Sequence, residues 1–399
     1  MNRRTIRIAI IIGMTSLLIS MSLVWTIGVV GSAASDKTYV GSEKCKDCHD
    51  QIFAKWRQTP HANVIQEVKK NPDAIKGDFK TPDTARTFKK NEVVMTSGLI
   101  WKQRYITKDW KILPAQWNYE TQKWAPYNVD KWKEEDWRSF CGYCHTTGYD
   151  SKKLAWKELN VGCEACHGPG SKHVENKEEK NELALGEPPD IINPASLTSD
   201  QAAMVCGQCH TRGTSPDGVF PFPVDYRPGD VLSAKNFTPV PYTDTKAWWP
   251  NKTVKQHRQQ YIEWRVTKHA KAGVNCSVCH DAHVTRNKFQ TKTSQNNLCL
   301  GCHPQISTDA ERGHAPVGGT LRQHSDCVGC HMSAVGKSAE VGDEHTHTFR
   351  FIAPIATINL GGGDVKNQPN SCSVCHAGAP VDALQADFAE RMPFRSSRP

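Results

Sequence analysis

The sequence predicts a mainly α-helical fold with much irregular structure and one small antiparallel β insert. Three observations support this prediction. The five-residue motif C-x-x-C-H occurs eight times along the chain. Only 38% of the 399 residues are hydrophobic, which is low for a globular protein of this length. Runs of β-branched and aromatic residues, the composition typical of strands, are concentrated in residues 93–127.

The C-x-x-C-H motif is the attachment signature of a c-type haem. Its two thiols can bond to the two vinyl groups of one haem, and the histidine that follows can ligate the iron. The eight motifs use all sixteen cysteines, so the sequence predicts eight haem c groups, numbered here in motif order. The predicted attachment residues are Cys45, Cys48, Cys141, Cys144, Cys163, Cys166, Cys206, Cys209, Cys276, Cys279, Cys299, Cys302, Cys327, Cys330, Cys372 and Cys375. The predicted proximal iron ligands are His49, His145, His167, His210, His280, His303, His331 and His376. Zinc clusters or a disulfide framework are the alternatives, but neither requires a histidine after every cysteine pair.

Eight haems are expected to replace much of an ordinary hydrophobic core. The exported chain would have roughly 46 residues for each haem, which is too few for large cores made of side chains alone. We therefore expect the polypeptide to wrap around a stack of haems in short helices and long loops. Without haem we expect little stable fold, because the energy of cofactor binding is then part of the energy of folding.

Residues 1–34 are expected to direct export rather than to fold. The first seven residues contain three arginines and are followed by an apolar run over residues 8–30. The small residues that end at Ala34 are typical of a signal-peptidase cleavage site. The apolar run is also long enough to span a bilayer, so a retained, uncleaved anchor is the alternative. In both cases we expect a periplasmic or extracellular protein, which contacts the membrane only if this segment is retained.

The motifs divide the rest of the chain into five expected segments. These are residues 35–135 with haem 1 and the β insert, 136–212 with haems 2–4, 213–253 as a linker rich in proline and glycine, 254–335 with haems 5–7, and 336–399 with haem 8 and the tail.

Two local predictions follow within these segments. Residues 93–96, 101–107 and 112–113 are β-branched and aromatic runs, which predict strands of an antiparallel subdomain whose aromatic residues form its own core. After the linker, residues 254–271 are expected to be helical and to carry His257 and His269.

Nine histidines lie outside the motifs, and eight haems need at most eight distal ligands. This near match favours six-coordinate irons with two histidine ligands and low potentials. The distal candidates are His61, His173, His257, His269, His283, His314, His324 and His347. We expect His345 to be the spare, because alternate residues of an extended segment point to opposite sides. One open iron stays possible, since only one ligand is in excess.

The formal net charge of +9 does not indicate nucleic-acid binding. The sum includes three arginines of the export segment and omits the propionates, two on each haem, which would make the loaded protein slightly negative. Basic stripes with interleaved aromatic residues are absent from the sequence.

Two regions of the chain resemble known cytochromes. The N-terminal residues Tyr39-Val40-Gly41-Ser42, with Thr59-Pro60-His61-Ala62 and the run V-G-C-E-A-C-H-G-P-G-S-K-H at 161–173, resemble the tetrahaem cytochrome family that accepts electrons from hydroxylamine oxidoreductase in ammonia oxidisers. The C-terminal runs H-R-Q-Q-Y-I-E-W, C-S-V-C-H-D-A-H and H-T-H-T-F-R are similar to multihaem cytochromes of anaerobic respirers. The resemblance implies an octahaem c-type cytochrome of this superfamily, with alternating parallel and perpendicular haem pairs that carry electrons.

The expected function is electron transfer along eight haems in anaerobic or extracellular respiration. The expected partners are other redox proteins, namely cytochromes, a quinol-linked membrane complex or a terminal acceptor, and a homo-oligomer or filament is possible. All eight motifs keep their histidine, so no sequence feature marks a catalytic haem and no catalytic residue is predicted. The alternative is an octahaem oxidoreductase that acts on nitrite, hydroxylamine, tetrathionate or a similar nitrogen or sulfur compound at one open haem.

Overall fold

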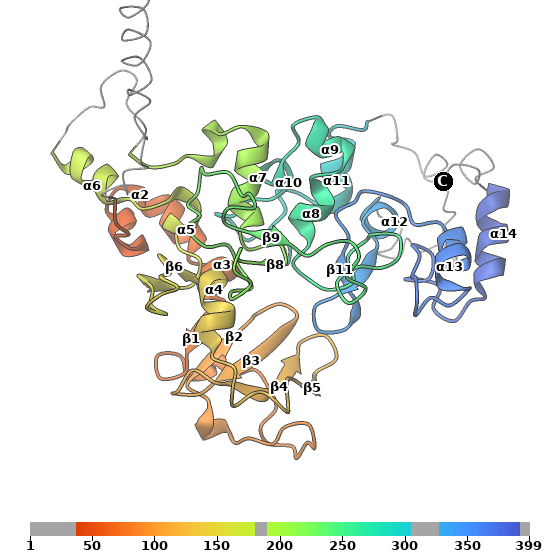
Figure 1. The fold of residues 1–399 in the computed structure, drawn as a ribbon, viewed down its shortest axis with the longest axis horizontal. Coiled ribbons are helices and arrows are strands. Elements are labelled where there is room, and N and C mark those ends of the chain that lie inside the picture. The colour runs from red at the N-terminus through yellow and green to blue at the C-terminus, as the bar shows by residue number, and fades with distance from the viewer. Residues whose placement is uncertain (1–36, 180–189, 305–326, 392–399) are drawn as a thin grey trace, which may run out of the picture. The chain divides into compact units, whose positions relative to one another are not determined.

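The computed structural model describes residues 37–179, 190–304 and 327–391. The predicted export segment and two distal candidates, His314 and His324, lie outside these residues. Within them, no helix is both long enough and apolar enough to cross a membrane. The described chain consists of short helices, long irregular connections and small antiparallel sheets (Figure 1). The coarse fold class predicted from the sequence is therefore confirmed.

The α-helices are short, and most lie at or beside an attachment motif. They are α2 (Ser42–Trp56), α3 (Pro60–Asn63), α4 (Tyr143–His145), α5 (Glu164–His167), α6 (Ser171–Glu178), α7 (Ser199–Gly207), α8 (Gln260–Trp264), α9 (Lys268–Lys271), α10 (Cys276–Cys279), α11 (Gln295–Leu300), α12 (Cys327–His331), α13 (Pro354–Gly361) and α14 (Val381–Arg391). Short 3₁₀ turns lie at Pro72–Ala74, Lys90–Glu92 and Pro194–Ser196, and one π turn lies at Arg138–Gly142. One helical turn places the two cysteines of a motif, three positions apart, on the same face.

The predicted β insert is a five-stranded antiparallel sheet in sequence order. Its strands are β1 (Ile65–Glu67), β2 (Met95–Ser97), β3 (Lys102–Ile106), β4 (Ile112–Asn118) and β5 (Lys123–Pro126), shown in orange in Figure 1. Tyr105, Leu113, Trp117 and Trp124 are buried together beside Phe88. The aromatic residues of the insert thus form its own core, as the sequence predicts.

The other named strands of the described residues form three two-stranded sheets. They pair β6 (Thr146–Thr147) with β7 (Glu158–Leu159), β8 (Gly213–Thr214) with β9 (Thr238–Pro239), and β10 (Ala334–Lys337) with β11 (Val341–His345), all antiparallel.

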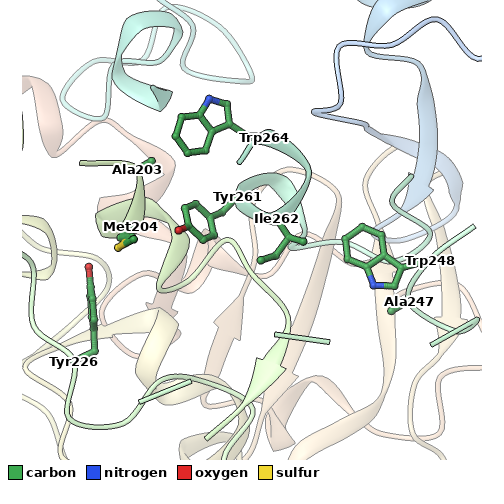
Figure 2. Packing of buried hydrophobic residues seen from close by; sticks show 8 residues of the cluster. All are labelled: Ala203, Met204, Tyr226, Ala247, Trp248, Tyr261, Ile262 and Trp264. Atoms are coloured by element: carbon green, nitrogen blue, oxygen red, sulfur yellow. The ribbon is translucent and has the colours of Figure 1, made fainter. Parts of the chain in front are cut away.

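The proline-rich segment 213–253 contains no helix but is firmly packed. The β8–β9 pair joins its two halves. Its residues Tyr226 and Trp248 are buried in one cluster with Met204 of α7 and Tyr261 of α8 (Figure 2). Apolar burial of this kind holds an irregular segment in place without regular hydrogen bonding.

The prediction of one helix over residues 254–271 is wrong. The structure has two short helices there, α8 and α9, and His257 precedes both of them. Residues before α8 bond to β10 instead, since His257 N donates to Lys337 O at 3.0 Å. Arg258 then has φ +68°, a left-handed conformation that a continuous helix does not allow.

Candidate haem sites

Histidine rings face one another at five places in the described chain, with ring centres 6.2–6.4 Å apart. Each pair joins one motif histidine to one histidine from outside the motifs. The pairs are His49–His173 at 6.4 Å, His61–His210 at 6.4 Å, His167–His283 at 6.2 Å, His269–His303 at 6.2 Å and His280–His347 at 6.4 Å. The motif histidine of each pair assigns it to a haem: His49 to haem 1, His167 to haem 3, His210 to haem 4, His280 to haem 5 and His303 to haem 6.

This spacing fits an iron between the two rings. A metal–nitrogen distance of about 2.0–2.1 Å, with roughly 1.1 Å from the nitrogen to the ring centre, puts two rings on one metal about 6.3 Å apart. Packed aromatic rings can also have centres about 4.5–7 Å apart, so the second mark of these five pairs is that each joins a motif histidine to a histidine from outside the motifs. The residues therefore fit a haem iron with one histidine on each face.

Backbone carbonyls orient several of these rings. Nδ1 of His167 lies 2.8 Å from Ile192 O, and Nδ1 of His280 lies 2.9 Å from Phe289 O. A hydrogen bond from Nδ1 to a carbonyl leaves the other ring nitrogen free for a metal. Burial lowers the pKa of both imidazoles, which favours the neutral form that ligates.

The five pairs fall into two classes of ring orientation. The interplanar angle is 14° for His49–His173, 21° for His167–His283 and 25° for His280–His347. It is 77° for His61–His210 and 86° for His269–His303. Near-parallel and near-perpendicular ligand planes perturb the iron orbitals differently, so the two classes are distinguishable by electron paramagnetic resonance.

Attachment motifs that lie side by side in the structure are not always consecutive in the sequence. The thiol of Cys45 in motif 1 lies close enough to the thiol of Cys163 in motif 3 for each to shift the pKa of the other. Cys144 of motif 2 contacts Cys209 of motif 4 in the same way. Cys206 of motif 4 in turn contacts Cys276 of motif 5. Attachment sites 1 and 3, 2 and 4, and 4 and 5 are therefore adjacent.

Motif 2 differs from the motifs with facing histidines. His145 is buried, and its Nδ1 has no hydrogen-bond partner among the described residues. Its ring contacts that of Trp137, with ring centres 6.3 Å apart and the planes tilted by 48°. Within the described ranges, no histidine ring faces His145 at the spacing of the five pairs. The predicted distal ligand His257 does not face a motif histidine there either.

The remaining predicted ligands are placed as follows. His331 ends α12, and His376 lies in the turns between α13 and α14. His345, which we expected to be the spare, has its Nδ1 only 2.6 Å from Met332 O. This is the same arrangement that orients His167 and His280, so its other nitrogen is equally available for a metal. The distal ligands of haems 2, 7 and 8 stay predictions.

Two buried carboxylates that the sequence reasoning missed support the ligand-bearing segments. Glu164, 0% exposed, accepts hydrogen bonds from the backbone N–H of Val40, Gly41 and Gly170 at 2.7–2.9 Å. The Glu164 carboxylate thereby connects the N-terminal segment to the turn before α6, the helix that carries His173. The turn itself requires a glycine after His167, because Gly168 has φ +74°.

Glu263 of α8 has the corresponding role near haem 5. Its carboxylate accepts hydrogen bonds from Val254 N at 2.7 Å, Thr346 Oγ1 at 2.7 Å and His347 N at 2.6 Å. Burial raises the pKa of Glu263 to about 7. A glutamate within a motif or a short helix carries no sequence signal of its own, since its partners are distant in sequence.

Comparisons with known proteins agree with this geometry. The family model described as cytochrome c554 and c-prime matches residues 44–96 and 96–168, and the doubled CXXCH motif model matches residues 269–308. The crystal structure of the outer cell wall cytochrome OcwA is similar with a TM-score of 0.70 and 26% identity, covering 88% of this chain and 86% of that one.

Two curated relatives match over shorter stretches. Cytochrome c nitrite reductase subunit NrfA of Nitratidesulfovibrio vulgaris is 25% identical over 237 residues, which are 49% of this chain and 41% of the relative. Cytochrome c-554 of Nitrosomonas europaea is 26% identical over 145 residues, which are 35% of this chain and 42% of the relative. The chain thus spans about two fifths of the length of each of these relatives.

The motifs, the facing histidines and these matches define the class: the chain is a multihaem c-type cytochrome that binds haem c. The resemblance to the superfamily that includes cytochrome c554 is confirmed.

Proposed function

We propose that this protein carries electrons along eight covalently bound haems in anaerobic or extracellular respiration. The observation that carries the proposal is the set of five histidine pairs at 6.2–6.4 Å. Haem c supplies reversible one-electron chemistry at its iron. The two histidines of each pair would hold one iron between them and leave no place on it for a small molecule, which suits electron relay.

The adjacency of the attachment sites supports a continuous route. The neighbouring thiols of motifs 1 and 3, 2 and 4, and 4 and 5 would hold the attached haems close together in that part of the chain. Site 4 contacts both site 2 and site 5, so haem 2 would lie on a branch from the route. The polypeptide contributes spacing, axial ligation and burial, with its helices and loops wrapped around the haems.

We place this carrier outside the cytoplasmic membrane, in the periplasm or at the cell surface. The export segment predicted at residues 1–34 supports this location, as does the similarity to a cytochrome whose title assigns it to the outer cell wall. Its partners would be other redox proteins: cytochromes, a quinol-linked membrane complex or a terminal acceptor.

Haem counting together with redox titration tests this proposal. The intact mass of the purified protein should exceed that of the exported chain by eight haems. Dithionite should reduce all of them, and an oxidised carrier protein or a soluble ferric chelate should reoxidise them. A protein that carries its haems but exchanges electrons with no external acceptor would refute the proposal.

A second candidate function rests on haem 2. The described chain presents no histidine ring opposite His145, although five other motif histidines have one. An iron with an open axial position can bind a small molecule. This observation favours a reaction with a nitrogen or sulfur oxy-compound at haem 2, fed with electrons through haem 4.

A further inference from the structure

One hydrogen-bonded network joins attachment motifs 2, 3 and 4. The phenol of Tyr143 in motif 2 donates to Oε1 of Gln208 in motif 4 at 2.9 Å. Nε2 of Gln208 donates to Ala165 O in motif 3 at 3.0 Å, and to Val205 O of α7 at 2.8 Å. A single amide side chain thus links its own attachment motif to two others.

The side chains of this network face away from the haems. Tyr143 and Gln208 occupy the same position in their motifs, directly before the second cysteine, and both motifs form helical turns. With 3.6 residues in each turn, this position points about 130° away from the midpoint of the two cysteines, which must face their haem. The attached haems therefore leave room for the network.

Packing holds both side chains in place. Gln208 is only 8% exposed. The ring of Tyr143 stacks on that of Phe222, from the proline-rich segment, with ring centres 4.9 Å apart and an interplanar angle of 4°. Displacement of the Gln208 amide would leave several polar groups unsatisfied, because its oxygen and its nitrogen are both bonded. The network is therefore a firm link between the motifs.

This link joins attachment sites that the adjacent thiols of motifs 1 and 3, 2 and 4, and 4 and 5 leave in two groups. Motif 3 also lies beside motif 4, since the thiol of Cys144, burial and the thiol of Cys166 together raise the pKa of Cys209. The bond from Gln208 to Ala165 O lies at this connection. Electrons on a route through all five sites would have to cross it.

We propose that Gln208 and Tyr143 are positioning residues that hold motifs 2, 3 and 4 at fixed separations and thereby set the rate of electron transfer among their haems. The inference rests on the proposed function of electron transfer. An electron that crosses the junction oxidises one ferrous iron and reduces one ferric iron, and no bond or proton moves with it. Because the rate of such a transfer falls steeply with distance, residues that fix the distance control the rate.

Photoreduction of the haem-loaded protein, followed by freeze-quench electron paramagnetic resonance, tests the proposal. The histidine planes are near-parallel at haem 3 and near-perpendicular at haem 4, so the redistribution of electrons between the two classes of signal can be timed. Gln208→Met keeps the length of the side chain but removes its amide. This variant should redistribute electrons several-fold more slowly, with an unchanged haem content and unchanged low-spin signals in the oxidised protein.

Two tyrosine variants form a matched pair. Tyr143→Phe keeps the ring that stacks on Phe222 and removes only the hydrogen bond between motifs 2 and 4. It should slow the reduction of haem 2 several-fold. The control is Tyr149→Phe, which removes a hydroxyl that donates to Arg138 O within the segment of motif 2. The control should redistribute electrons as fast as the unchanged protein does.

Three outcomes would overturn the inference in distinguishable ways. If the unchanged protein takes up electrons but does not redistribute them, the proposed function fails and the inference fails with it. If Gln208→Met carries all its haems and redistributes electrons at the unchanged rate, electron transfer stands and the positioning role is refuted. If Gln208→Met loses haem, Tyr143→Phe decides the question, and rates equal to those of Tyr149→Phe refute the positioning role.

Discussion

Replacement of Glu263 tests how the polypeptide holds a haem ligand. The carboxylate accepts hydrogen bonds from Val254, Thr346 and His347, and Glu263 is 1% exposed. In Glu263→Ala three buried donors lose their acceptor. Each unsatisfied donor costs about 1–3 kcal/mol, so with partial relaxation we expect a loss on the order of 3–6 kcal/mol in the free energy of unfolding.

The same substitution should alter one haem and spare the others. His347 faces His280 at 6.4 Å with an interplanar angle of 25°. Loss of the bond that fixes the His347 backbone would let this ring rotate or detach. In the oxidised protein, one low-spin signal of the near-parallel class should shift or become high-spin, while the signals of the other pairs remain.

Two variants calibrate this experiment. Thr346→Val removes one of the three hydrogen bonds and should cost about 1 kcal/mol. Glu120→Ala removes an exposed carboxylate and should change stability by less than about 1 kcal/mol. If Glu263→Ala has the same unfolding free energy and the same low-spin signals as Glu120→Ala, our account of ligand positioning is incorrect.

Three further predictions address other parts of the molecule. His173→Ala should convert haem 1 to high spin, seen as a resonance signal of one haem, because His173 faces His49; an unchanged spectrum would contradict the pairing. Burial raises the pKa of Glu158 above 4.5, so the folded state binds its proton more tightly than the unfolded state. The free energy of unfolding should therefore fall as pH rises from about 4.5 to the raised pKa, and Glu158→Gln should weaken this dependence on pH. An equal dependence on pH in both proteins would refute the prediction. The chain produced without haem attachment should lack the cooperative unfolding transition of the loaded protein in calorimetry, since haem binding contributes to folding; a native-like transition would oppose this.

The sequence predicted those features that depend on local patterns. Two cysteines and a histidine within five residues identify a haem site wherever they occur, and the β-branched runs of residues 93–113 identify strands. The aromatic core of the insert also followed, because Trp117 and Trp124 lie on strands that pair directly. Each of these features is determined within a short stretch of chain.

Features that depend on distant contacts could not be predicted in this way. The pairing of His173 with His49, and of His283 with His167, is set by tertiary packing. The helix expected over residues 254–271 is interrupted because its first residues bond to β10 and to Glu263. The buried carboxylates of Glu164 and Glu263 bond to backbone groups that are distant in sequence, which no local pattern indicates.

The most direct test of the central claim is a coulometric redox titration of the intact protein, with the haem content of the same sample determined by mass. We predict that each chain takes up and returns eight electrons reversibly, one for each C-x-x-C-H motif. Fewer electrons than bound haems, or reduced haems that no external acceptor can reoxidise, would contradict electron transfer along the whole chain.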